Sequence, residues 1–199
     1  MVRHRWLLWK LGLCASGCGH CFKIFTHMTL QEKFLLYDLA HKLASGAVVV
    51  EIGSYIGASA SFLAAGRWNR GGLVYCVDTW KNEAMTEGER DTFREFTKNT
   101  ERFKEVIVPL KGLSQDMARI FHKEIDLLFI DGDHSYKGVK EDVEAWFPKL
   151  NEKAIVIFHD IGWAEGVQKV VAECVRPRAK KEICLPNTYV AYFVRRGEA

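Results

Sequence analysis

Short apolar runs that alternate with helix-like segments constrain the fold of this chain most. Five such runs recur along the sequence, at residues 47–52, 73–77, 106–110, 125–130 and 154–158. Strands that are apolar throughout are typical of a parallel sheet whose two faces are both covered by helices. The sequence therefore predicts an α/β fold built on a doubly wound, mostly parallel sheet.

Helix signals lie before and between these runs. Thr29 and Glu32 have the spacing of a capping box, and apolar residues then follow a helical period towards Gly46. Further helices are expected at residues 58–65, 87–103, 139–150 and about 165–175. Each helix would return the chain to the start of the next parallel strand, as a doubly wound sheet requires.

The end of the chain has a different pattern. Residues 182–185 and 189–194 are apolar runs joined only by Pro186-Asn187-Thr188. A connection this short suits a hairpin better than a crossover helix. We therefore expect the last strand to be antiparallel to its neighbours.

Length and charge limit the possible functions. The chain of 199 residues has room for one well-buried domain, and its net charge of +3 comes from scattered Lys and Arg, which does not indicate a nucleic-acid surface. No uninterrupted run approaches the ~20 apolar residues of a membrane span. Residues 3–25 mix basic and apolar character, similar to a signal peptide, but Lys10 interrupts the apolar run. We expect an N-terminal extension at 1–28, a domain at 29–199 and a cytoplasmic protein.

Polar side chains gather where the run 125–130 ends. Asp131, Asp133 and His134 follow it directly. Ligands of open parallel sheets bind beyond the carboxyl ends of the strands, so these groups are expected in a cleft. Two carboxylates and an imidazole at this place indicate an enzyme, although Asp133 also suits a turn cap and His134 a structural role.

A glycine-bearing turn follows the first run, and an acid ends the second. Gly53 and Gly57 would let the backbone approach a ligand closely, although the turn lacks the full three-glycine fingerprint. Asp78 is positioned to accept hydrogen bonds from two ribose hydroxyls. Together they predict a site for an adenosine-containing cofactor.

Four segments in order carry a family resemblance. They are Val49-Val50-Glu51-Ile52-Gly53-Ser54-Tyr55-Ile56-Gly57, Val77-Asp78-Thr79-Trp80, Phe129-Ile130-Asp131-Gly132-Asp133-His134-Ser135-Tyr136 and Phe158-His159-Asp160. With them the chain resembles class I S-adenosylmethionine-dependent methyltransferases. It looks most like the small bacterial O-methyltransferases grouped with macrocin O-methyltransferase and cephalosporin hydroxylase-like proteins. The resemblance implies a Rossmann-like, seven-stranded sheet whose last strand is antiparallel.

The resemblance also implies roles for single residues. Glu51 and Gly53 would lie near the methionine part of the cofactor, Asp78 would bind the ribose and Ser114 would lie near the adenine. The cofactor set implied by these motifs is completed by Ser54, Gly57 and Asp131.

Metal-dependent relatives hold Mg²⁺ with an aspartate that ends the fourth strand and two oxygen ligands that end the fifth. Those positions correspond here to Asp131 and to His159 with Asp160. Imidazole suits Mg²⁺ less well than it suits transition metals, so the divalent ion could differ. His134 corresponds to the position of a general base. The implied reaction is methyl transfer to a hydroxyl of a small molecule, such as a sugar, a polyketide or a catechol-like compound, and a homo-oligomer could complete the pocket.

Other readings remain open at this point. Tyr136 and Lys140 have the spacing of the catalytic pair of short-chain NAD(P)-dependent oxidoreductases, and a non-catalytic cofactor-binding module is a further alternative. Cys14, Cys18 and Cys21 match the spacing of an iron–sulfur motif, or of a zinc site completed by His20. Their position before the first helix favours unligated cysteines.

Overall fold

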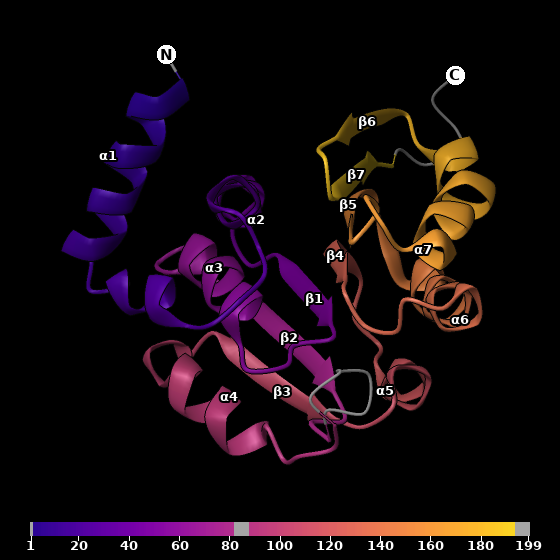
Figure 1. Ribbon diagram of the computed structural model, residues 1–199, viewed down its shortest axis with the longest axis horizontal. Helices are drawn as coiled ribbons and strands as arrows, with labels where there is room; N and C mark the ends of the chain where they lie inside the picture. The colour runs from indigo at the N-terminus through magenta and orange to yellow at the C-terminus, as the bar shows by residue number, and fades with distance from the viewer. Residues whose placement is uncertain (1, 82–87, 194–199) are drawn as a thin grey trace.

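A seven-stranded sheet forms the centre of the computed structural model, which describes residues 2–81 and 88–193, with side chains from Leu8 onward (Figure 1). The strands follow the order β3-β2-β1-β4-β5-β7-β6 across the sheet. Their bounds are β1 Val48–Ile52, β2 Leu73–Asp78, β3 Ile107–Lys111, β4 Ile125–Ile130, β5 Leu150–His159, β6 Lys181–Cys184 and β7 Thr188–Tyr192.

Pairing within the sheet confirms the predicted fold class. Strands β1 to β5 pair in parallel, and β7 lies antiparallel to both β5 and β6. The strand order reverses between β1 and β4, since β2 lies on one side of β1 and β4 on the other. In open α/β sheets this reversal opens a crevice at the carboxyl edge.

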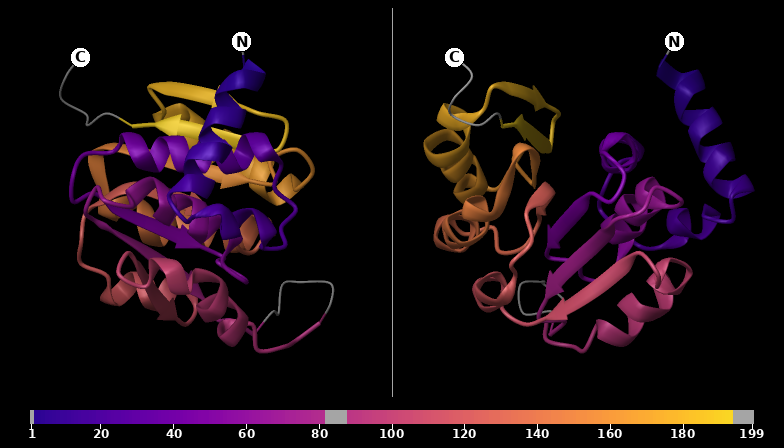
Figure 2. Two further views of the ribbon diagram at one scale, coloured as in Figure 1. Left: turned by 90° about the vertical axis from the view of Figure 1, so that its left-hand side faces the viewer. Right: turned by 180° about the vertical axis from the view of Figure 1, so that it is seen from behind.

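Helices cover both faces of the sheet (Figures 1 and 2). Helices α2, α3 and α4 pack with one apolar cluster that includes Phe62 and Phe129, and α5, α6 and α7 pack with a second that includes Leu128 and Trp146. Alternate residues of β4 thus enter opposite layers, which explains why this strand is apolar throughout. The helix bounds are α1 Val2–Ala15, α2 Leu30–Lys42, α3 Ala58–Arg67, α4 Phe93–Thr100, α5 Ser114–Ile120, α6 Tyr136–Trp146 and α7 Glu165–Val170.

Several predicted bounds were wrong. The helix expected at 139–150 spans Tyr136–Trp146, because a 3₁₀ turn that contains Pro148 ends it and β5 begins at Leu150. Helix α4, at Phe93–Thr100, is shorter than the helix expected at 87–103, and a 3₁₀ turn follows it at Glu101–Phe103. Residue 87 and residue 194, the end of the expected last strand, lie outside the described residues. Helices α1 and α5 were not predicted.

The N-terminal segment packs onto the same side as α2 and α3. Trp9 of α1 is only 8% exposed and contacts the rings of Phe22, Phe34 and Phe62. Cys18 and Cys21 are buried in the same cluster, without a disulfide. Within residues 2–81 and 88–193, no helix is long and apolar enough to cross a bilayer.

Candidate active site

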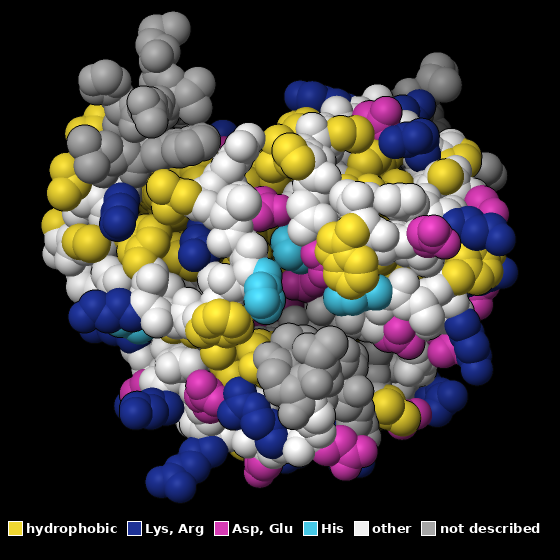
Figure 3. Space-filling model, in the orientation of Figure 1, with side chains coloured by type: hydrophobic (Ala, Val, Ile, Leu, Met, Phe, Trp, Pro, Cys, Tyr) yellow, Lys and Arg dark blue, Asp and Glu magenta, His cyan; other side chains and the backbone are white. Residues whose placement is uncertain are grey.

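A cleft of about 1110 Å³ opens at the carboxyl edge of the sheet, where the strand order reverses. Acidic and histidine side chains gather in a hollow on the face seen in Figure 3. Predicted site residues that line the cleft come from the ends of β1, β2, β4 and β5 and from the start of α5, namely Gly53, Ser54, Asp78, Ser114, Asp131, His134, His159 and Asp160. Glu51 and Gly57 are not among the lining residues.

The glycine turn after β1 is shaped by two close approaches. Gly53 has φ +84°, and a side chain there would overlap the carbonyl oxygen of Asp131 at the end of β4. Gly57 has φ +87° and faces Thr100 and Phe96, so it lets α3 begin against α4. Between them, Ser54 lines the cleft with a buried hydroxyl that has no hydrogen-bond partner among the described residues.

Asp78, at the end of β2, ties this turn to the next loop. One carboxylate oxygen accepts from the backbone amide of Tyr55 at 2.8 Å, and the other accepts from that of Trp80 at 2.6 Å. Trp80 Nε1 in turn donates to the carbonyl of Tyr55 at 2.9 Å. Because each carboxylate oxygen can accept two hydrogen bonds, Asp78 retains acceptor capacity on the side of the cleft.

Glu51 lies beneath the turn and is fully buried. Neither of its carboxyl oxygens makes a hydrogen bond of good geometry with a described residue. Burial raises the pKa of Glu51 to about 7, although the nearby hydroxyls of Ser54 and Ser59 oppose this shift. A carboxyl beneath the glycine turn therefore changes charge near neutral pH.

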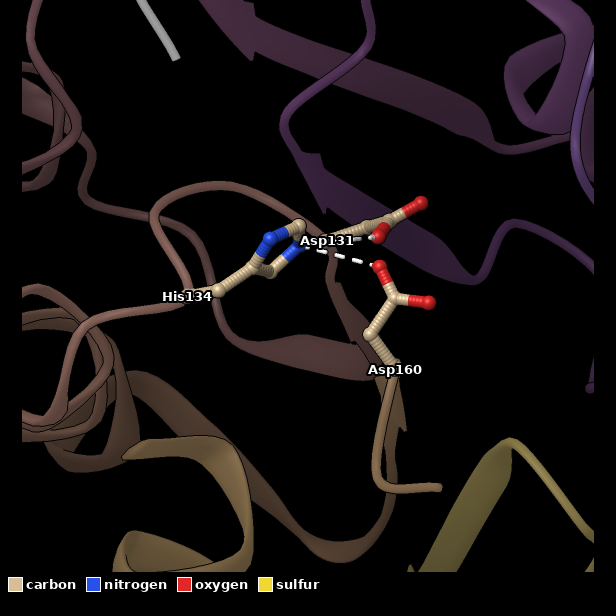
Figure 4. A group of neighbouring side chains, drawn as sticks. All are labelled: Asp131, His134 and Asp160. Atoms are coloured by element: carbon tan, nitrogen blue, oxygen red, sulfur yellow. Dashed lines mark ion pairs between the residues drawn. The ribbon is translucent and has the colours of Figure 1, made fainter. Parts of the chain in front are cut away.

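The opposite side of the cleft is strongly ionic. One oxygen each of Asp131 and Asp160 and one ring nitrogen of His134 lie within 4.8 Å of one another. Figure 4 shows the imidazole of His134 pointing at both carboxylates, with Nε2 at 3.0 Å from Asp160 Oδ2 and 3.8 Å from Asp131 Oδ1. This nitrogen is buried, yet no described residue gives it a hydrogen bond of good geometry.

His159 approaches the same carboxylates from the end of β5. Its Nδ1 lies 3.2 Å from Asp131 Oδ1 and 3.2 Å from Asp160 Oδ1. Asp160 has φ +59°, a strained backbone conformation that turns its carboxylate back towards this group. The structure thus brings together all three predicted metal ligands and the predicted base.

These contacts shift the pKa values of His134, His159 and Asp160. The carboxylates of Asp131 and Asp160 raise the pKa of His134 to about 9. Burial disfavours a charged His159, but Asp131, Asp160 and Glu32 together raise its pKa to about 12. Burial also disfavours ionised Asp160, yet His134 and His159 hold its pKa far below the usual range. At neutral pH both imidazoles are therefore protonated in this arrangement.

Two further predicted residues have local partners. Asp133 accepts from the amide of Ser135 at 2.7 Å, the turn-capping geometry expected of it. Ser114, at the start of α5, accepts from Trp146 Nε1 at 2.8 Å and still lines the cleft.

Sequence reasoning missed four contributors to the site. Glu32 lies 3.4 Å from His159 Nε2, and Asn187 donates to Asp160 Oδ1 at 2.8 Å. Exposed aromatic rings of Phe25 and Trp163 also line the cleft. Asn187 had a signal in its place in the hairpin turn, and Trp163 lies three residues after Asp160, whereas Glu32 and Phe25 come from a segment distant in sequence.

Comparisons with known proteins agree with this geometry. Residues 50–161 match the family described as methyltransferase domain. The chain is 32% identical over 140 residues to an uncharacterised protein, y4gI, of Sinorhizobium fredii, and the match covers 65% of this chain but 15% of that protein. The chain therefore spans a small fraction of this curated relative.

Solved structures share the fold at low identity. The O-methyltransferase NovP superposes with a TM-score of 0.70 and 15% identity, over 85% of this chain and 82% of that chain. An O-methyltransferase from Bacillus cereus, solved in complex with S-adenosylhomocysteine, gives a TM-score of 0.66 and 15% identity, over 96% and 91% of the two chains. The family match covers more than half of the chain and confirms the resemblance seen in the motifs. The chain belongs to the family of methyltransferase domains.

Proposed function

We propose that this chain is an S-adenosylmethionine-dependent O-methyltransferase that acts on a small-molecule hydroxyl with the help of a divalent cation. The observation that carries the proposal is a single cleft with two chemically different walls. One wall has the glycine turn and Asp78, and the other has Asp131, His134, His159 and Asp160. Methyl transfer needs such a pair, one wall for the methyl donor and one to activate and align the acceptor.

The cofactor wall suits an adenosyl group with a charged amino acid part. The unpartnered hydroxyl of Ser54 and the remaining acceptor capacity of Asp78 both face the cleft. Asp78 would accept from the ribose hydroxyls, while Gly53 and Glu51 would surround the methionine part. The complex of the Bacillus cereus enzyme with S-adenosylhomocysteine supports this choice of cofactor.

The ionic wall suits a divalent cation. Asp131, His159 and Asp160 would be its ligands, a set of two carboxylates and one imidazole that favours Mn²⁺ or another transition metal over Mg²⁺. The carboxylates of Asp131 and Asp160 crowd together at the end of the sheet, and a cation would balance their negative charge. The side chain of His159 is 6% exposed, whereas that of His134 is 33% exposed, so His159 is the better fixed ligand.

His134 is our candidate for proton removal. A bound divalent cation would lower the pKa of the acceptor hydroxyl and fix its oxygen. His134 Nε2 would take the hydroxyl proton, and S-adenosylmethionine, held by the glycine turn and Asp78, would supply the methyl group to the acceptor oxygen and leave as S-adenosylhomocysteine. Asp131 and Asp160 keep His134 protonated at neutral pH. His134 would therefore act as a base only after a bound cation has balanced the negative charge of these two carboxylates.

The acceptor would enter past two exposed aromatic rings. Phe25 and Trp163 line the cleft, and Trp163 donates from Nε1 to Asp160 Oδ1 at 2.8 Å. These rings suit an acceptor with a flat or apolar body and a hydroxyl at its tip, such as a catechol-like, polyketide or sugar compound. The cytoplasmic location and a homo-oligomer stay predictions.

The oxidoreductase alternative is not favoured. Tyr136, which would have to act as its catalytic acid, donates to Glu173 at 2.8 Å instead and does not line the cleft. That reading also gives no role to the ionic wall.

Methyl-labelled S-adenosylmethionine tests the proposal. The labelled cofactor is incubated with catechol, sugar and polyketide hydroxyl compounds, with Mn²⁺ or with a chelator. We expect label in an ether product that the chelator abolishes. Label transfer that resists the chelator would contradict the cation, and cofactor binding without transfer to any hydroxyl compound would contradict the reaction.

A further inference from the structure

Glu32 has a second set of contacts beyond the helix cap that its sequence position predicts. It is only 5% exposed, and its two carboxylate oxygens face different partners. Oε2 accepts from the amide of Thr29 at 2.7 Å and from its hydroxyl at 2.8 Å, which completes the capping box of α2. Oε1 is therefore not needed for the cap.

Oε1 instead points towards the ionic wall of the cleft. It accepts from the Thr188 hydroxyl on β7 at 2.9 Å and lies 3.4 Å from His159 Nε2. Burial disfavours an ionised Glu32, but its contact with His159 and the hydrogen bonds from Thr29 and Thr188 lower its pKa to about 2. Glu32 is thus a buried carboxylate with a cationic partner, as buried charges require.

The ring of His159 is consequently held between two acidic groups. Nδ1 faces Asp131 and Asp160, and Nε2 faces Glu32. Asn187 Nδ2 lies 3.5 Å from Nε2, but this amide donates to Asp160 Oδ1 at 2.8 Å. Since an amide N–H and an imidazole N–H are both donors, Glu32 is the acceptor available to Nε2.

We propose that Glu32 is a positioning residue for His159: it accepts a hydrogen bond from Nε2 and so leaves Nδ1, which faces Asp131 and Asp160, to bind a divalent cation. The inference rests on the proposed function, because it concerns the same cation. A carboxylate behind a ligating histidine fixes the tautomer and the ring orientation, and its loss weakens metal binding about 10- to 100-fold. The cap of α2 thereby couples the N-terminal helix layer to the site.

Two variants separate this role from capping. Glu32→Gln removes the charge behind His159. Thr29→Ala damages the same cap by removing one hydrogen bond to Oε2, but it keeps the backbone amide on Oε2 and the contact of Oε1 with His159. Both are titrated, as the whole 199-residue chain, with Co²⁺ by calorimetry, and the visible spectrum of bound Co²⁺ reports its ligand field. We expect Glu32→Gln to weaken Co²⁺ binding at least ~10-fold and to alter the spectrum, and Thr29→Ala to stay within about twofold of wild type.

Each other outcome overturns the inference in a distinguishable way. Equal Co²⁺ affinity and equal spectra in both variants would leave Glu32 as a helix cap only, with the proposed function intact. Wild type that binds no Co²⁺ would overturn the cation of the proposed function and this role with it. If Glu32→Gln does not fold, Glu32→Asp replaces it: its shorter carboxylate cannot reach both Thr29 and His159, so the same loss of affinity is expected.

Discussion

The two walls of the cleft are built in opposite ways. On the cofactor wall, Asp78 is held by backbone amides of the neighbouring loops, and Glu51 is buried without an ionic partner. On the ionic wall, His134 and His159 are held by Asp131, Asp160 and Glu32. One wall thus depends on backbone shape and the other on charge balance between side chains from distant segments.

This difference decides how each wall should respond to change. The cofactor wall, whose shape depends on the backbone, should tolerate the loss of one charge but should depend on the packing that holds the backbone in place. A charge-built wall tolerates packing changes far away but fails when one member leaves an unpaired ion. Variants that act on one wall and spare the other therefore test the division.

Packing of α1 on the layer of α2 and α3, the helix that follows the glycine turn, should give the largest effect. Trp9→Ala removes a buried ring that packs on α2 and α3, and we expect a loss of about 4 kcal/mol in the free energy of unfolding. Leu8→Ala is the control, because Leu8 is exposed on the same helix. Urea denaturation measures both, and equal midpoints would show that α1 does not support the domain.

On the ionic wall, Asp160→Asn should abolish cation binding. The change removes a ligand and leaves His134 and His159 short of a carboxylate partner, so Mn²⁺ affinity should fall at least ~100-fold by calorimetry. Asp133→Asn, which alters only a turn cap, should bind Mn²⁺ like wild type. The division fails if Asp160→Asn lowers S-adenosylmethionine affinity by as much.

Stability should depend on pH through Glu51. Its pKa is about 7 when folded, above the ~4.5 of an unfolded glutamate, so the folded state keeps a proton that the unfolded state releases. This contribution is fully present below pH ~4.5 and is lost as pH rises through about 7. Relative to Glu51→Gln, wild type should lose about 3 kcal/mol between pH 4.5 and 8. Denaturation curves that stay parallel over this range would show that Glu51 ionises normally.

Asp78→Asn should give the smallest effect. Asparagine keeps one acceptor oxygen but loses the charge that strengthens a hydrogen bond from ribose, so S-adenosylmethionine affinity should fall about tenfold. Asp116→Asn, on the exposed surface of α5, is the matched control. Mn²⁺ affinity should not change in either variant, and a joint loss would mean that the two walls are coupled.

The same difference explains what the sequence could predict. Gly53 and Asp78 follow directly from strand ends, since the period of the apolar runs locates those ends. Asp131, His134, His159 and Asp160 could be placed at one edge for the same reason. The charge balance among them could not be predicted, because Glu32 has a complete local explanation as a helix cap. Helix α5 was missed because its seven residues are too few to show a helical period.

The N-terminal segment illustrates a second limit. Residues 1–28 were set apart as an extension that precedes the first predicted helix, and that division stays a prediction. Trp9, Cys18 and Cys21 nevertheless lie in the same apolar cluster as Phe62 of α3. These contacts join side chains from segments far apart in the sequence, so no local sequence pattern predicts them.

Titration of the wild-type protein with S-adenosylmethionine and, separately, with NADH tests the assignment of the cofactor wall most directly. We predict that S-adenosylmethionine binds with one-to-one stoichiometry, that a chelator leaves this affinity unchanged, and that NADH does not bind. Binding of NADH without binding of S-adenosylmethionine would contradict the methyltransferase function and return the oxidoreductase to first place.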